Sequence, residues 1–462
     1  MLTITESGLS RRSFLTAGSL ALGGLSLTNL LSGRATAGDT ASLATGKSVV
    51  FLFLQGGPSQ LETFDPKPEA PEGTRTITGT IPTTLPGVRF GEHLVRLAKL
   101  ADRFSVVRNF QTNNNGHNIQ PIVGPDSNNA NVGSLYSRVV GSTRPSSGMP
   151  TNVVVFPGAV MKDVLKGNAR GDIVATGSLG SGYAPFLPEG GQLQKDMRLS
   201  VAQDRLSDRQ QLRSELDRLT QKVAYAAEQK QIDELHRQAY EVLLSGGVAK
   251  ALDLSLEDPA TIARYDTTVH SRGDAWNKVR RGKAGMYTGH AKALGKQLLL
   301  ARRMCEAGAG FVTIHDGYDG VWDMHADSNN LNIKDGMEAC APAFDHAVAA
   351  FIEDVEARGL SDKILLVCCG EMGRTPKVNR NGGRDHWGKL APLLLYGGGL
   401  PHGQVLGQSN RDGGEPASNP VNPKHLISTI LHGLFDVGRL RVAPSMSQVA
   451  KLAEHAPIPG TF

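Results

Sequence analysis

The sequence predicts a three-layer α/β fold built on a doubly wound, mostly parallel sheet. Short apolar runs rich in β-branched residues recur along the chain, and segments of helical periodicity separate them. Several of these runs are apolar throughout rather than alternating, as expected of strands covered on both faces. The alternation of strands and helices then places helices on both sides of the sheet.

Six strands are expected, over residues 49–54, 104–110, 151–157, 310–316, 363–370 and 392–399. Amphipathic helical patterns lie between them, over residues 93–103, 293–308 and 342–359. The last two patterns end at a glycine, a common residue just after a helix C-terminus.

One region departs from this alternation. Residues 200–245 are charged, contain no proline and have a helical period. We therefore expect a helical insertion at about 192–285 within an α/β domain that spans 46–462. The glycine-rich stretch 177–191 reads as a long loop able to overhang a site.

The N-terminus carries a targeting signal. Arg11 and Arg12 precede a short, glycine-diluted apolar run, and small residues at 35–37 offer a cleavage site. This pattern predicts a twin-arginine signal peptide over 1–37, and export to the periplasm or beyond by the twin-arginine machinery, which carries folded proteins. No later run approaches ~18 uninterrupted apolar residues, so the mature chain is not expected to span a membrane.

Charge and cysteine content exclude several classes. The formal net charge is only +5 and no long basic run is present, which argues against a nucleic-acid partner. The four cysteines form neither a CxxC pair nor a disulfide framework, so we interpret them as small buried hydrophobic residues. No GxGxxG follows the first strand, which argues against a dinucleotide-dependent redox enzyme.

Polar clusters follow four of the expected strands, at residues 55–68, 111–121, 316–327 and 371–387. The last of these is broken by glycines, and we expect it to form a loop. In an open α/β sheet, ligands bind beyond the carboxyl ends of the strands. Side chains distant in sequence are therefore expected to converge there.

Two of these clusters contain candidate metal ligands. Asp323 and His325 stand two residues apart, and a carboxylate with an imidazole suits Zn, Mn or Fe; the alternative is a hydrogen bond that orders a loop. Glu371 comes directly after a buried strand, where it needs a cation or an ion pair with Arg374 or Arg384.

Further candidates complete a possible site for one or two divalent ions. Asp385 and His386 can reach a metal, whereas His117 is a candidate ligand, general acid–base or plain loop residue. Arg374 and Arg384 match the oxygens of an anionic group, or pair with neighbouring carboxylates.

Several motifs carry a resemblance to a known family: "GGPSQLETFDPKP", "WDMHAD", "GEMGRTP", "GRDHW" and "YGGGLPHGQVLGQSN". In this order they resemble domain-of-unknown-function family 1501, within the alkaline-phosphatase-like superfamily that includes the sulfatases. The resemblance implies a two-metal site at the strand ends. Asp323 with His325 resembles one ligand pair, Glu371 stands at a second ligand step, and His386 resembles the last histidine ligand.

Two departures qualify this resemblance. Gln55, Gly56 and Gly57 stand where the superfamily has a metal-binding Asp, and the loop around His117 offers no hydroxyl nucleophile. The sulfatase signature CxPSR is also absent. The leading hypothesis is an exported metal-dependent hydrolase of phosphate or sulfate esters, on a small molecule or a polysaccharide. The alternative is a catalytically inactive relative that binds an anionic glycan or a protein partner.

Overall fold

A computed structural model describes residues 43–145, 147–162, 164, 168–188, 247–279, 283–316 and 320–462. The predicted signal peptide over 1–37 and most of the predicted helical insertion lie outside these residues.

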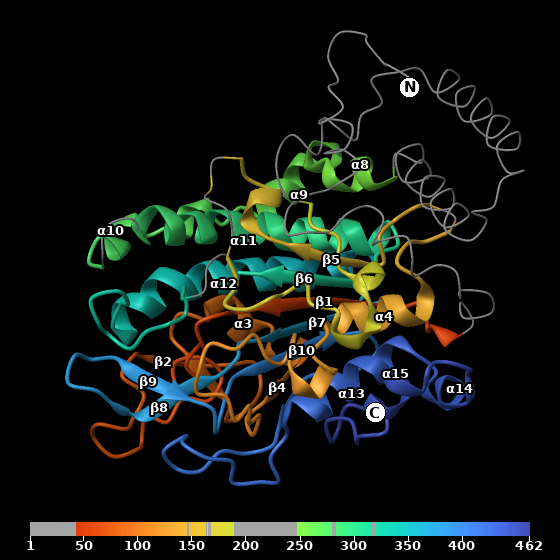
Figure 1. Cartoon of the computed structure of the whole chain (residues 1–462). Helices are drawn as coiled ribbons and strands as arrows, with labels where there is room; N and C mark the ends of the chain where they lie inside the picture. The colour runs from red at the N-terminus through yellow and green to blue at the C-terminus, as the bar shows by residue number, and fades with distance from the viewer. Residues whose placement is uncertain are drawn as a thin grey trace, which may run out of the picture.

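A seven-stranded sheet forms the centre of the fold, in the order β11-β4-β10-β7-β1-β6-β5 (Figure 1). Its strands are β1 (Ser48–Phe53), β4 (Ser105–Val107), β5 (Asn152–Val155), β6 (Phe311–His315), β7 (Ile364–Cys369), β10 (Leu393–Gly397) and β11 (Gln404–Leu406). Only β10 runs antiparallel to its neighbours, β7 and β4. The mostly parallel sheet and all six expected strands are confirmed, whereas β11, three residues long, was not predicted.

Helices cover both faces of this sheet (Figure 1). One face packs against α3 (Val95–Lys99), α11 (Lys283–Glu306) and α12 (Ile333–Ala357), and the other against α4 (Val132–Val140), α13 (Pro423–Leu434), α14 (Val437–Val442) and α15 (Ser447–Leu452). Along β1, Val50 and Leu52 belong to the first core and Val49, Phe51 and Phe53 to the second. Since every residue of β1 is buried, its apolar run follows from packing on both faces. The three-layer α/β class is confirmed.

The long helices begin earlier than predicted. Helix α12 starts at Ile333 rather than at Pro342, because the side chain of Asn332 caps its N-terminus by accepting from the N–H of Asp335. Pro342 lies inside this helix, although a proline usually marks a helix start. Helix α11 likewise starts at Lys283, ten residues before the predicted boundary.

The stretch 371–387 was predicted to be a loop, and this is wrong. It contains an antiparallel hairpin of β8 (Gly373–Val378) and β9 (Arg384–Trp387), in which Arg374 pairs with His386. A second hairpin joins β2 (Thr80–Pro82) and β3 (Arg89–Gly91). The β8–β9 hairpin lacks an apolar pattern because the side chains that it buries are the charged Arg374 and Arg384, which donate hydrogen bonds to carbonyl and carboxylate oxygens of the protein.

The described part of the predicted insertion contains the short helices α8 (Gly247–Leu252), α9 (Pro259–Arg264) and α10 (Gly273–Trp276). Its carboxylate Glu257 pairs with Arg302 at 2.7 Å and Arg303 at 3.0 Å, both on α11. Burial would raise the pKa of Glu257, but these hydrogen bonds outweigh it and lower the pKa to about 2. These ion pairs therefore link the described part of the predicted insertion to helix α11 of the α/β core.

Two further expectations concern cysteines and membranes. All four cysteines are buried and free, as predicted. Within the described residues, we find no helix with the length and apolar character needed to cross a bilayer.

Candidate metal centre

Three strand ends supply the residues of the candidate centre. Residues 55–57 follow β1, Asp323 lies beyond β6, and Glu371 comes two residues after the end of β7. Because these strands are adjacent and parallel, their carboxyl ends meet at one edge of the sheet. The expected convergence of the polar segments therefore takes place.

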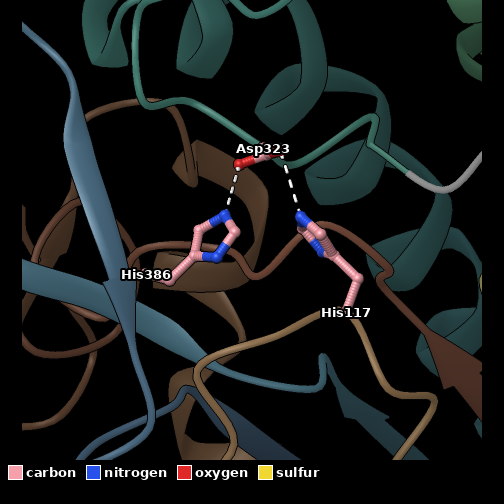
Figure 2. A group of neighbouring side chains, drawn as sticks. All are labelled: His117, Asp323 and His386. Carbon is pink, nitrogen blue, oxygen red and sulfur yellow. Dashed lines mark hydrogen bonds and ion pairs between the residues drawn. The ribbon is translucent and has the colours of Figure 1, made fainter.

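Asp323 is the centre of this group (Figure 2). Its Oδ2 lies 3.1 Å from His117 Nε2, and its Oδ1 lies 3.2 Å from His386 Nε2. Figure 2 shows both imidazole rings directed at the one carboxylate. One ligand atom from each of the three residues lies within 4.8 Å of the others, close enough to share a metal ion.

His117 is held from both sides by carboxylates. Its Nδ1 lies 2.7 Å from Glu371 Oε1, while its Nε2 faces Asp323. Burial would lower the pKa of His117, but the hydrogen bonds with Asp323 and Glu371 outweigh it and raise the pKa to about 9. Since a carboxylate only accepts hydrogen bonds, the Nε2 position requires either a proton or a cation.

The ring of His386 is also oriented by a polar partner. Its Nδ1 lies 3.0 Å from the carbonyl oxygen of Asn115, an acceptor, so Nδ1 carries a hydrogen and Nε2 is directed at Asp323. A polar partner thus orients each of the two rings so that Nε2 points at one carboxylate. This donor set of two imidazoles and a carboxylate fits a Zn, Mn or Fe ion.

Arg374 is fully buried and is hydrogen-bonded within the protein at each of its three nitrogens. Nη2 contacts Asp323 Oδ1 at 2.8 Å, Nε donates to the carbonyl of Gly57 at 2.8 Å, and Nη1 donates to the carbonyl of Arg384 at 3.2 Å. Burial would raise the pKa of Asp323, but the charge of Arg374 and the hydrogen bonds from the histidines lower it well below its usual range. Arg374 therefore holds Asp323 ionised and in place.

His325 lies at the edge of the group. Its Nε2 is 3.2 Å from Asp323 Oδ2 and 3.0 Å from the amide nitrogen of Asn330, and its side chain is 23% exposed. The Asp323 contact raises the pKa of His325. His325 is thus a half-buried imidazole, about as exposed as His386, beside the three candidate ligands.

Two predicted site residues lie elsewhere. Arg384 is fully buried, pairs with Glu62 at 2.9 Å and donates to the carbonyl of Arg75 at 2.7 Å. Asp385 is exposed and accepts from the side chain of Asn379 at 3.1 Å. The alternation of side chains along β9 explains the position of Asp385, because it sends Asp385 to the face opposite His386. Arg384 is on the same face as His386 but is held by Glu62 instead. Glu371 pairs with His117 rather than with either arginine.

The base of the centre is the segment Gln55–Gly57, which in the sequence stands out as a departure from the superfamily pattern. The N–H of Gly56 donates to Glu371 Oε1 at 2.8 Å, and the Gly56 and Gly57 carbonyls accept from Arg374. Gly56 has φ +117°, and a Cβ there would lie 2.6 Å from the Asp323 nitrogen. Only glycine allows this approach of two backbones.

The fold and the centre together define an α/β protein with a candidate cation site at the carboxyl ends of its central strands. Residues 46–444 match the family described as "Protein of unknown function (DUF1501)", and the chain belongs to that family.

A comparison with solved structures finds matches that include two enzymes named in their descriptions. PsFucS1 sulfatase from Pseudoalteromonas sp. is 12% identical with a TM-score of 0.33, covering 92% of this chain and 72% of that one. The lipoteichoic acid synthase LtaP from Listeria monocytogenes is 9% identical with a TM-score of 0.28, covering 89% and 78%. A third, Ps i-CgsB, is 11% identical with a TM-score of 0.34, covering 84% and 72%. No curated protein matches the sequence.

Proposed function

We propose that the protein is a metal-dependent hydrolase of phosphate or sulfate esters. The observation that carries this proposal is the convergence of His117, Asp323 and His386, whose ligand atoms lie within 4.8 Å of one another. Both rings turn Nε2 toward a carboxylate that cannot donate a hydrogen bond, which is the arrangement expected around a cation.

One divalent ion, of Zn, Mn or Fe, would be held by His117, Asp323 and His386. A bound cation of this kind polarises an ester oxygen and lowers the pKa of water. Glu371 would fix the ring of His117 through Nδ1, and Arg374 would fix the Asp323 carboxylate. His325, half-buried beside Asp323, would hold and pass on a proton at Nε2.

Charge balance supports an anionic substrate. A dication and the guanidinium of Arg374 would face the two carboxylates Asp323 and Glu371, which leaves one positive charge uncompensated. Because the nitrogens of Arg374 are all bonded to the protein, the cation, with His325 beside it, would bind the anion in its place. A phosphate or sulfate ester of a small molecule or polysaccharide satisfies this requirement.

The same proposal includes export. Arg11, Arg12 and the cleavage pattern at 35–37 support passage through the twin-arginine machinery to the periplasm or the exterior.

The alternative function is binding without turnover, of an anionic glycan or a protein partner. One observation favours this alternative. Among the described residues, no hydroxyl or thiol that could act as a nucleophile is hydrogen-bonded to His117, Asp323 or His386. A covalent ester intermediate on such a group is therefore not part of the proposal, and water would be the nucleophile.

Metal analysis of the purified protein, followed by a panel of aryl phosphate, phosphodiester and sulfate ester substrates, tests the proposal. We expect about one Zn, Mn or Fe per chain and turnover of at least one ester. His386→Ala removes a half-buried ligand and should lower both metal content and turnover at least tenfold. His402→Ala, at an exposed histidine just before β11 whose ring contacts the carbonyl of Asp102, is the matched control and should change neither. Metal without turnover would favour the binding function, and absence of metal would refute the centre.

A further inference from the structure

We propose that Gln55 is a positioning residue, which holds the His117 loop and the Asp323 segment in the relative placement that a cation requires. The proposal rests on the proposed cation site but concerns a side chain that ligates nothing itself. Gln55 is the second residue after β1 and is fully buried. It therefore lies directly beyond a buried strand of the central sheet, at the base of the centre.

The two ends of the Gln55 amide bind different segments. Nε2 donates to the carbonyl oxygen of His117 at 3.1 Å. Oε1 accepts from His315 Nε2 at 2.8 Å and from the backbone N–H of Arg170 at 3.1 Å. One side chain thus connects the His117 loop, the last residue of β6 and the segment around Arg170.

The backbone of the same residue reaches the Asp323 segment. The carbonyl of Gln55 lies 3.4 Å from the nitrogen of Trp322, the residue before Asp323. The next peptide, at Gly56, donates to Glu371, which in turn binds the ring of His117. Gln55 is therefore linked to the two residues whose separation decides whether they can share an ion.

Only an amide satisfies all of these partners. The carbonyl of His117 needs a donor, whereas His315 and the Arg170 N–H need an acceptor. A glutamate would keep the acceptor and lose the donor, and a methionine of similar volume would lose both. Because the site is buried, each unpaired group is costly and the His117 loop would shift to find water.

Hydrogen–deuterium exchange in the metal-free protein tests this inference without depending on activity. Gln55→Met should raise exchange at least tenfold both in the peptide 112–120 and at the amide of Arg170. Gln55→Glu should raise it only in 112–120, because its acceptor is retained. Gln297→Met is the matched control: Gln297 is equally buried and donates to the carbonyls of Val155 and His315, but none of its hydrogen bonds reaches the centre.

Cation affinity measured with Zn and Co gives the second readout. Both Gln55 variants should bind Zn at least tenfold more weakly than the unaltered protein and change the visible spectrum of the Co form, while Gln297→Met should leave both unchanged. Exchange in 112–120 that stays at the level of the unaltered protein in Gln55→Met overturns the positioning role. If the unaltered protein binds no cation, the proposed function fails, and the exchange comparison still decides the role of Gln55 in the fold of the loop.

Discussion

Replacing Arg374 by methionine should destabilise the metal-free protein by at least about 4 kcal/mol. The guanidinium is fully buried and carries the 2.8 Å ion pair with Asp323, and breaking a buried pair from one side costs about 3–5 kcal/mol. The substitution also leaves the carbonyls of Gly57 and Arg384 without their donor, at about 1–3 kcal/mol for each that finds no water. Such a loss is a large part of a typical total stability of about 5–15 kcal/mol.

Urea unfolding followed by tryptophan fluorescence measures this loss, with metal removed by chelation. Arg380→Met is the matched control, because Arg380 is an exposed arginine of the same hairpin. Arg374→Lys should fall between the two, since an ammonium keeps the charge but not the fork of donors. If Arg374→Met lost less than about 1 kcal/mol, like a typical surface change, Arg374 would not be the group that holds Asp323.

Three further outcomes are expected. Affinity for the cation should fall about tenfold for each pH unit below about 9, because the ion must displace the proton of His117, whose pKa is raised to about 9 in the ion-free centre. Dissociation constants that stay constant from about pH 6 to 8 would contradict this. Gly56→Ala should abolish cation binding and lower the melting temperature strongly, because its Cβ meets backbone. The control Gly73→Ala, at φ +84° with open space around it, should lower the free energy of unfolding by only about 1 kcal/mol. Equal losses of stability in the two variants would refute the close approach. Glu257→Gln should lower the free energy of unfolding by about 2 kcal/mol at neutral pH, because it weakens the pair with Arg302. The folded pKa of about 2 lies below the ordinary 4.5, so this contribution is present above about pH 4.5 and disappears as pH falls toward 2. The two proteins should therefore have converging stabilities in acid-denaturation curves.

The fold was predictable where burial on both faces produced continuous apolar runs. β1 and β7 are examples, since every residue of each is buried. The β8–β9 hairpin could not be found in this way, because its stability comes from buried arginines and from backbone pairing. The start of α12 was missed because a proline inside a helix resembles a helix start, and only the capping contact of Asn332 places the true boundary.

The candidate centre was predictable in its residue types and less so in their roles. Asp323, His386 and His117 were identified because acids and imidazoles followed strand ends, and parallel strands bring such ends together. The sequence could not separate Arg374 from Arg384, since both are buried in the same hairpin and only the register of β8 against β9 decides which one faces Asp323. Gln55 was noticed only for its place after β1, because a side chain that acts by holding backbone leaves no motif.

The contacts of the centre join parts of the chain that are synthesised far apart in time. His117 meets Asp323 across 206 residues and Glu371 across 254, and Gly57 meets Arg374 across 317. A growing chain therefore presents His117 long before Asp323 and His386 have left the ribosome, and an early ion would find only one of the three ligands. Ion capture would mark the completion of folding, because a chain shortened before His386 lacks a ligand together with β10, β11 and the helices α13, α14 and α15.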